Sequence, residues 1–399
     1  MYLVIDIKVL LVSNFRIEEG RGPLFRILNM LPYLIKYCDV VLFSFGEIDP
    51  EVYRMADFYN IKVYKTAYMN RGWFVLNSNQ IAGNIKKVAI KEKIDLVVLT
   101  WEIWDIAVSI YESLKNTNIK YIVTMHSIPF ATALIKTGNF TFDCLKKFLL
   151  EKNLMIKKYM LLRNYQAKKY IYSFDILTMT KTVEKKMLKY FPGLNLNLSY
   201  PGYAIEVPNF SLNTIDYKYD CIYMAKFEYG KGIFEFIKIV KNMIKFNDKL
   251  KFAVVGSFTF DKEKNKFYKM IKKNNLQKNI DCLGWLEGKE KYDILLKSKI
   301  FIYPSFIGDT FSQCLLEALA YGKKVVCYDV PFTRDNFDIS SVIKIPVFDT
   351  KKFALAALKL LNDKNYFSVE SYHFVKKNFN SWNDVAKAEY ECYRKVVDC

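Results

Sequence analysis

Two series of short apolar segments alternate with amphipathic helical stretches along this chain of 399 residues. In the first half, the expected strands cover residues 9–12, 40–45, 62–65, 96–100, 121–125, 176–180 and 196–200. Helical stretches separate most of them, for example residues 23–36, 80–93 and 104–115. Strands that are apolar on both faces are typical of parallel sheets covered by helices on both sides. The pattern therefore predicts a doubly wound α/β domain.

The alternation breaks at residues 202–217, a polar stretch that contains Pro208, and then resumes. The second series has expected strands at residues 221–224, 250–255, 280–283, 301–305 and 325–330, with expected helices at 233–246, 261–274 and 289–298. A chain of this length is also long for a single core. We therefore expect two Rossmann-like domains that face a cleft: residues 1–203, a linker at 204–217, and residues 218–381. Residues 382–397 predict a final amphipathic helix.

The overall charge is strongly basic, with a formal net charge of +19. Such a balance favours an anionic partner, which could be nucleic acid, an acidic membrane surface or a phosphorylated small molecule. The equally supported alternative is that the positive charge reflects only a lysine-rich composition and has no functional meaning. No apolar run approaches the length of a membrane span, and Asp6 and Lys8 interrupt the first apolar stretch, which indicates a strand and not a signal peptide. Eight cysteines without CxxC spacing predict reduced thiols in a cytoplasmic protein.

The segment at residues 301–330 predicts an anion site. A buried strand, a polar loop and a helix from Phe311 follow one another, and two carboxylates, Asp309 and Glu317, lie on either side of the helix start. Unpaired N–H groups and the helix dipole favour a phosphate there, between carboxylates about 10 Å apart. This arrangement suits a nucleotide sugar. The diphosphate would bind in the middle, one carboxylate would bind the ribose, and the other would bind the sugar.

The helix itself has clear signals at both ends. Thr310 and Gln313 have the spacing of a capping box, and Gly322 suits the position after the last turn. The apolar residues predict a buried stripe with Glu317 on its flank. A solvated glutamate is the ordinary alternative for Glu317. We favour a functional role because this carboxylate stands among alanines and leucines.

A second loop carries two lysines, Lys226 and Lys231, in the sequence MAKFEYGKG at residues 224–232. Two ammonium groups between a strand and a helix could hold a diphosphate and offset its charge without a metal. The alternative is two ordinary surface lysines. The next strand ends add VVGS at residues 254–257 and LGWLEG at residues 283–288, which strengthens the functional interpretation.

The N-terminal half contains weaker signals. Gly20 and Gly22 follow the first strand and would allow the backbone to approach a ligand closely. His126 ends an apolar strand, and a catalytic role and a structural role are equally supported. The sequence has no DxD, HExxH, GxSxG or P-loop pattern, so we expect neither a metal nor a serine-hydrolase mechanism.

Taken together, these motifs resemble GT-B glycosyltransferases of the family 4 type, which are retaining enzymes that use activated sugar donors. The family pattern PS-x-x-E-G-F-G…E resembles residues 304–317, PSFIGDTFSQCLLE, with Asp309 and Glu317 at its acidic positions. The pattern G-R-L-x-x-x-K-G resembles residues 225–232, AKFEYGKG. Weaker similarities lie at residues 20–22, 124–126, 201–202 and near Trp382, so the resemblance runs along nearly the whole chain. Lys226 replaces the usual Arg, Asp309 replaces Glu, and Gly20-Arg21-Gly22 replaces an adjacent glycine pair.

The resemblance implies an acceptor-binding N-terminal domain, a donor-binding C-terminal domain, and a terminal helix at residues 382–399 that crosses back to the first domain. Catalytic roles would fall to Asp309, Lys231, Lys226 and His126, with Asp309 on the transferred sugar and the lysines on the diphosphate. Donor-binding residues would be Glu317 (ribose), Gly20, Gly22, Gly256, Ser257, Leu286, Thr310, Phe311 and Ser312. The donor would be a UDP- or GDP-linked sugar, with no further cofactor and no metal.

The acceptor would be a glycan or a lipid-linked group. Residues 136–171 carry nine Lys or Arg residues against two acids, interleaved with apolar residues. This segment could bind the anionic inner face of a membrane, although a core helix with a basic face is the slightly favoured alternative. An epimerase or a phosphorylase of the same fold also remains open. So does a non-catalytic basic protein that binds polyanions or membranes, although we expect no specific nucleic-acid partner.

Overall fold

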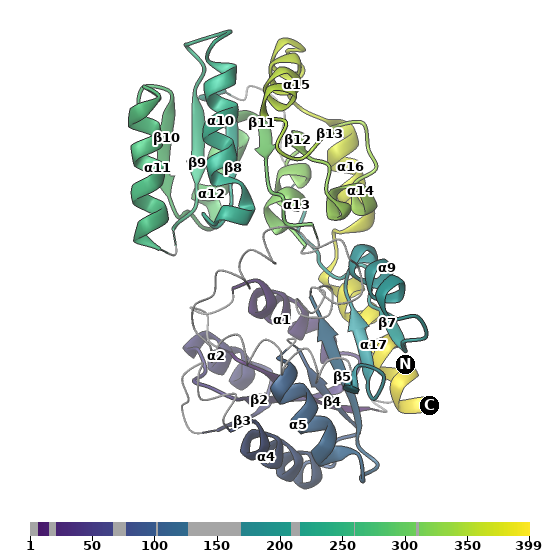
Figure 1. The fold of residues 1–399 in the computed structure, drawn as a ribbon. Coiled ribbons are helices and arrows are strands. Elements are labelled where there is room, and N and C mark those ends of the chain that lie inside the picture. The colour runs from purple at the N-terminus through teal and green to yellow at the C-terminus, as the bar shows by residue number, and fades with distance from the viewer. Residues whose placement is uncertain are drawn as a thin grey trace. The chain divides into compact units, whose positions relative to one another are not determined.

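The computed structural model describes residues 7–15, 21–66, 77–100, 103–126, 169–208, 216–258, 260–308 and 311–399. The chain divides into two compact units (Figure 1). Unit 1 contains Met1–Tyr203 and Ser381–Cys399, and unit 2 contains Ala204–Asn380. Each unit is built around one parallel sheet, as the alternation of apolar strands predicts.

Unit 1 holds a seven-stranded sheet in the order β3-β2-β1-β4-β5-β6-β7. Its strands are β1 (Lys8–Ser13), β2 (Asp39–Ser44), β3 (Lys62–Lys65), β4 (Leu96–Leu99), β5 (Lys120–Met125), β6 (Asp175–Thr178) and β7 (Leu196–Leu198). The described helices are α1 (Arg21–Leu34), α2 (Pro50–Phe58), α4 (Ser78–Lys91), α5 (Trp104–Leu114), α9 (Lys181–Tyr190) and α17 (Trp382–Asp398). The central strands are buried along their whole length because helices cover the sheet on both faces.

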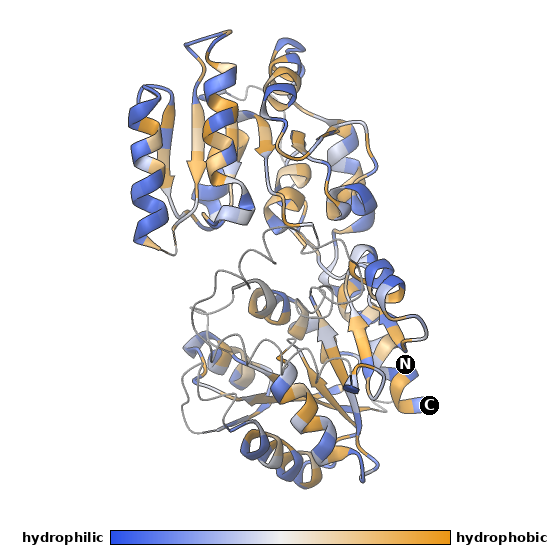
Figure 2. Cartoon of the chain, viewed as in Figure 1, coloured by the Kyte–Doolittle hydropathy of each residue, from blue (hydrophilic) through white to orange (hydrophobic). Residues whose placement is uncertain are grey.

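Unit 2 holds a six-stranded sheet in the order β10-β9-β8-β11-β12-β13. Its strands are β8 (Tyr219–Met224), β9 (Phe252–Val255), β10 (Ile280–Gly284), β11 (Ser298–Tyr303), β12 (Lys324–Tyr328) and β13 (Val342–Ile345). The helices are η1 (Tyr229–Lys231), α10 (Ile233–Met243), α11 (Asp261–Lys273), α12 (Gly288–Leu296), α13 (Gln313–Ala320), α14 (Pro331–Asn336), α15 (Thr350–Asn362) and α16 (Val369–Asn378). In Figure 2 the strands are largely hydrophobic, whereas α10 and α11 carry both colours, as expected of amphipathic helices.

The strand orders confirm two doubly wound sheets. In each sheet the order reverses between the first and the fourth strand of the unit, β1 and β4 or β8 and β11. Ligands of such sheets bind beyond the carboxyl ends of the strands at this switch point. In unit 2, the loops at the switch point are those that follow β8 and β11, which contain residues 225–232 and 304–312.

The last helix, α17, packs against α1 within unit 1, so the C-terminus returns to the N-terminal unit as expected. The rings of Phe25 and Trp382 meet edge to face with centroids 6.2 Å apart, and Tyr37 stacks on Tyr390 at 5.6 Å. Within the described ranges, no helix is both long and apolar enough to cross a membrane. The basic segment at residues 136–171 falls largely outside the described residues.

Candidate functional site

The two loops at the switch point of unit 2 are joined by hydrogen bonds. The carbonyl oxygen of Gly230 accepts from the backbone N–H of Phe306 at 3.1 Å and from the hydroxyl of Ser305 at 3.3 Å. The loop that carries the two candidate lysines therefore lies directly against the loop that follows β11. Sequence alone could place each loop at a strand end, and the adjacency of β8 and β11 brings them together.

Gly232 makes this contact feasible. Its φ is +82°, and a Cβ at this position would lie only 1.9 Å from the carbonyl oxygen of Pro304. A residue with a side chain would meet both a backbone clash and an unfavourable backbone conformation. Because α10 begins at the next residue, Gly232 also fixes Lys231 at the N-terminal end of this helix.

The two lysines have different surroundings. Lys231 is half-buried, its carbonyl accepts from the hydroxyl of Tyr223 at 3.0 Å, and its ammonium is close enough to Cys314 of α13 to act on that thiol electrostatically. The Lys226 side chain is 55% exposed, and its ammonium pairs with Glu228 at 2.9 Å. Lys231 is thus half-buried within electrostatic range of α13, whereas Lys226 lies at the surface with an ion-pair partner.

Glu317 is buried. The prediction that it lies on the flank of the buried stripe of the helix is wrong. Its side chain is 3% exposed, and Lys291 of α12 contacts its Oε1 at 2.8 Å. Burial raises the pKa of Glu317, whereas Lys291 acts in the opposite direction. The ion pair compensates the buried charge, which is why this helix can turn a carboxylate inward. Lys291 was not anticipated, because nothing in the sequence separates it from the many other lysines.

The start of α13 also differs from the prediction. The helix begins at Gln313 and not at Phe311, and its N-cap is Ser312, whose hydroxyl accepts from the N–H of Leu315 at 3.4 Å. Phe311 instead packs against the rings of Phe332 and Phe379, at 5.4 and 6.3 Å. Two predicted site residues, Asp309 and Thr310, lie outside the described residues. The helix end is as expected, because Gly322 has a φ of +64° and follows the C-cap.

The loops after β9 and β10 join the same edge of the sheet. Met224 and Val255 are paired in register, so the loops after β8 and β9 start side by side. A Cβ on Gly256 would lie 1.9 Å from the carbonyl oxygen of Ala225, and the carbonyl of Ser257 accepts from the N–H of Phe227 at 2.8 Å. Gly256 also donates to the carbonyl of Gly284 at 2.8 Å. Leu286 follows β10 two residues later and is partly exposed.

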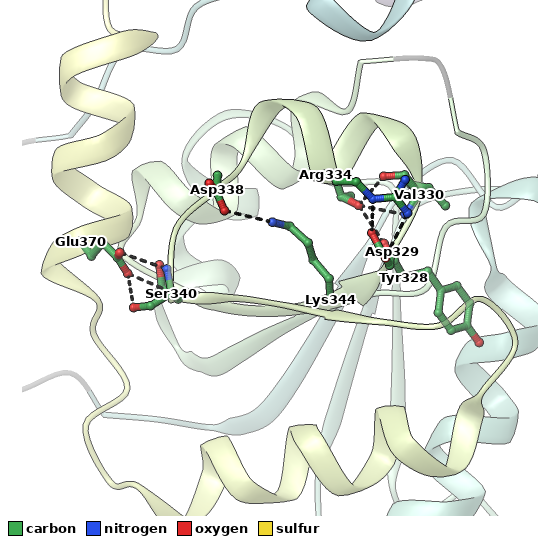
Figure 3. A network of polar contacts seen from close by, with 10 residues as sticks. Tyr328, Asp329, Val330, Arg334, Asp338, Ser340, Lys344 and Glu370 are labelled. Atoms are coloured by element: carbon green, nitrogen blue, oxygen red, sulfur yellow. Dashed lines mark hydrogen bonds and ion pairs between the residues drawn. The ribbon is translucent and has the colours of Figure 1, made fainter.

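The segment after β12 contacts the loop after β11 as well. The N–H of Phe332 in α14 donates to the carbonyl of Gly308, at 3.0 Å. Figure 3 shows polar contacts around this segment: Arg334 of α14 pairs with Asp329 at 3.0 Å, and Glu370 of α16 accepts from the hydroxyl of Ser340 at 2.7 Å. The last described residue before Asp309 is therefore anchored by a helix from a neighbouring strand.

His126 of unit 1 uses both ring nitrogens. Nε2 lies 2.9 Å from the carbonyl oxygen of Thr100, and Nδ1 lies 3.2 Å from the hydroxyl of Tyr203. A carbonyl can only accept, so Nε2 carries a proton and donates to Thr100, while Nδ1 pairs with the Tyr203 hydroxyl. These contacts favour the structural interpretation of His126. Gly20 lies outside the described residues, and Gly22 lies in the first turn of α1.

In the described ranges, no group of acidic, histidine and cysteine side chains is arranged so that it could hold a metal ion. The seven cysteines placed by the structure are free thiols. The chemistry available at the edge of the unit 2 sheet thus consists of a half-buried ammonium, a buried carboxylate with its counter-ion, and glycine-lined backbone. Such groups can bind a phosphorylated ligand that also offers hydroxyl donors.

Comparison with known proteins gives a family match for part of the chain. Residues 209–379 match the family model of glycosyl transferases group 1, and these residues lie within unit 2. This part of the chain is similar to that family, and the match supports glycosyl transfer as the activity. No curated protein sequence matches the chain.

Solved structures extend the similarity to the whole chain. A glycosyltransferase from Rickettsia africae has a TM-score of 0.71 at 16% identity, with 98% of each chain covered. Sucrose-phosphate synthase from Thermosynechococcus elongatus has a TM-score of 0.73 at 14% identity, again with 98% of each chain covered. HepE of Anabaena in complex with UDP and glucose has a TM-score of 0.70 at 11% identity, covering 98% of this chain and all (100%) of HepE. At such low identity the likeness shows a shared fold, which is that of GT-B glycosyltransferases.

Proposed function

We propose that this protein is a retaining, metal-independent glycosyltransferase of the family 4 type. It transfers a sugar from a UDP- or GDP-linked donor to a glycan or a lipid-linked acceptor. One observation carries the proposal: inside the region that matches the glycosyltransferase model, the loops after β8 and β11 join at the switch point and bring Lys231 to the helix that carries Glu317. The structures of HepE with UDP and with UDP-glucose favour UDP among the donor bases.

The proposed donor site uses the residues on this edge of the sheet. Lys231 and the N-terminal end of α10 bind the diphosphate, with Lys226 as a second, exposed cation that must leave Glu228 to do so. Glu317 accepts hydrogen bonds from the ribose, and Asp309 binds hydroxyls of the transferred sugar. Gly256, Ser257, Leu286, Thr310, Phe311 and Ser312 complete the donor-binding set in this domain, and Gly20 and Gly22 remain candidates for a close backbone approach to the ligand.

In the proposed reaction the departing phosphate takes the proton of the acceptor hydroxyl on the same face of the sugar. No enzyme nucleophile is required, and the configuration at the anomeric carbon is retained. Lys231 stabilises the negative charge that develops on the leaving diphosphate, which is the electrostatic contribution expected of preorganised cations. His126 remains a candidate neighbour of the reacting sugar, with its ring held by Thr100 and Tyr203.

Nucleotide binding distinguishes a nucleotide-sugar enzyme from a non-catalytic protein that binds polyanions. A thermal-shift panel of UDP, GDP, ADP and their sugars should show stabilisation by one base in preference to the others. A non-catalytic polyanion-binding protein would instead respond to any polyanion with a steep dependence on salt and no base preference. The absence of any nucleotide selectivity would contradict the proposal.

Catalysis is tested by Lys231→Ala, with Lys241→Ala as the matched control. Lys241 is a lysine in the last turn of α10, and its side chain is exposed. Loss of Lys231 should lower kcat for release of the nucleotide by about 10²-fold or more, as for other electrostatic groups in active sites, and leave the melting temperature unchanged. The control should keep full turnover. NMR of the product's anomeric proton then distinguishes retention from inversion, and dependence on acceptor separates transfer from epimerisation or phosphorolysis.

The proposed cellular place is the cytoplasm, with peripheral attachment to the inner membrane face through residues 136–171. Co-sedimentation with anionic vesicles at low salt, lost at high salt, is the expected result. Absence of binding at low salt would leave a glycan in solution as the favoured acceptor.

A further inference from the structure

Lys291 of α12 and Glu317 of α13 form an ion pair inside the region that matches the glycosyltransferase model. The ammonium of Lys291 is 2.8 Å from Oε1 of Glu317, with side-chain exposures of 19% and 3%. The same ammonium lies 4.5 Å from the centroid of the Tyr292 ring, which stacks on Tyr321 at 4.8 Å and 9°. Lys291 is thus fixed between a carboxylate and a pair of stacked rings.

The other titratable groups around Glu317 cannot replace Lys291. Cys314, one turn earlier in α13, has its pKa raised to about 12 and stays neutral. Tyr292 and Tyr321 have raised pKa values for the same main reason, burial, and are also neutral. The ammonium of Lys231 acts on Cys314, whereas the ionic contact with the Glu317 carboxylate comes from Lys291, and the neutral Tyr292 hydroxyl adds a hydrogen bond to it. One cation therefore compensates this buried charge directly.

We propose that Lys291 is a positioning residue for the donor: it holds Glu317 in the ionised form and in the rotamer that accepts hydrogen bonds from the ribose hydroxyls. A carboxylate has about four acceptor sites on two oxygens, so the contacts of Lys291 and the Tyr292 hydroxyl leave two sites for a diol. This inference rests on the proposed function, because it takes a nucleotide as the ligand of Glu317.

The physical consequence is a change in the pH dependence of nucleotide binding. Burial already raises the pKa of Glu317, and Lys291 is the first cause that opposes the shift. Without Lys291, Glu317 should stay protonated to a higher pH, because an uncompensated buried carboxylate is costly. A protonated Glu317 loses acceptor capacity, so the ribose would lose its partner at neutral pH.

The test compares wild type, Lys291→Met, Lys291→Arg and the double variant Lys291→Met/Glu317→Gln. Lys241→Met is the control for loss of an exposed lysine outside the site. Calorimetry between pH 6 and pH 9 measures the affinity of each variant for UDP and GDP, and compares each nucleotide with its 2′,3′-dideoxy form. In parallel, ¹³C NMR of carboxyl-labelled glutamate follows the titration of Glu317, which is assigned with Glu317→Gln.

We expect wild type and Lys291→Arg to prefer the nucleotide over its dideoxy form at all these pH values. Lys291→Met should bind about 10- to 100-fold more weakly at pH 7, the range expected for lost hydrogen bonds to a charged group, and should recover as the pH rises. Its Glu317 signal should titrate at a higher pH than in wild type. The double variant should bind weakly without any pH dependence.

Two results would overturn the inference while the proposed function stands: an unchanged Glu317 titration in Lys291→Met, or unchanged preference for the ribose hydroxyls in that variant. If the wild-type protein binds no nucleotide, the proposed function fails and the ribose assignment fails with it. The NMR titration then still decides whether Lys291 controls the ionisation of Glu317, so the two failures are distinguishable.

Discussion

The guanidinium of Arg26 in α1 donates to the carboxylate of Glu389 in α17, and the two residues are 363 positions apart in the chain. Both side chains are buried, with exposures of 3% and 2%. Arg26 also donates to the carbonyl of Gly202 at 2.6 Å, and Glu389 accepts from the hydroxyl of Tyr393. This ion pair ties the last helix of the chain to the first helix of unit 1.

Breaking this pair from either side should destabilise the packing of α17. Arg26→Met or Glu389→Gln leaves one buried group without its partner, and we expect a loss of about 3–5 kcal/mol in the opening free energy of α17. Hydrogen exchange followed by mass spectrometry measures that quantity helix by helix. Glu112→Gln, which removes an exposed pair with Lys115, should change stability by less than about 1 kcal/mol. Unchanged exchange in α17 would show that the pair contributes nothing.

Three glycine-to-alanine variants separate steric contact from backbone conformation. Gly232→Ala should be the most destabilising, by about 3 kcal/mol or more, because it combines a positive φ with the clash at Pro304. Gly284 has a φ of +74°, and a Cβ added there would meet no atom within 4 Å, so its alanine variant should cost about 1–2 kcal/mol. Gly83 lies inside α4 in open space, and alanine there should stabilise the protein by about 0.5–1 kcal/mol. Urea denaturation ranks the three, and a different order would contradict the close approach of the two loops.

Lys323 should make the stability of unit 2 depend on pH in the alkaline range. Its amino group is buried, donates to the carbonyls of Leu296 and Ser298 at 3.1 and 2.6 Å, and burial lowers its pKa to about 7. Between pH 7 and the ordinary lysine value near 10.5, the unfolded chain binds more protons than the folded one, so stability should rise with pH. The slope for one such group is at most about 1.4 kcal/mol per pH unit.

Comparison of Lys323→Met with the wild type isolates this contribution. Free energies of unfolding in urea at pH 7, 8 and 9 should rise less steeply in the variant. An exposed lysine, Lys241, provides the control, since Lys241→Met should leave the wild-type slope intact. Parallel pH profiles for wild type and Lys323→Met would contradict a neutral buried lysine.

The thiol of Cys314 should be unreactive although its helix borders the candidate site. Burial, with Glu317 as the next cause, raises its pKa to about 12, so its thiolate population at pH 8 is about 10³-fold below that of a thiol with an ordinary pKa of 9. Cys399 is exposed and should be alkylated first. Iodoacetamide labelling with mass spectrometry assigns each position. Rapid labelling of Cys314 in the native protein would show that α13 is more open than the structure indicates.

Much of the fold was predictable from local sequence patterns. The apolar runs mark the strands because strands covered on both faces need apolar residues on both faces, and glycines mark loop positions such as Gly232 and Gly322. The family-like motifs were found at strand ends for the same reason. The helix start was misplaced because Thr310 and Ser312 are both good caps, and the choice between them depends on where Phe311 packs.

The sequence by itself thus determined the two doubly wound sheets and the loops that border their carboxyl ends. Only the tertiary structure decided the partners: Lys291 for Glu317, Tyr203 and Thr100 for His126, and Glu389 for Arg26. Periodicity reports which face of a helix or strand is apolar, and it is a property of neighbouring residues. A buried charge needs a counter-ion, which often lies on another helix or strand. The local sequence pattern does not indicate which of the many lysines is that counter-ion.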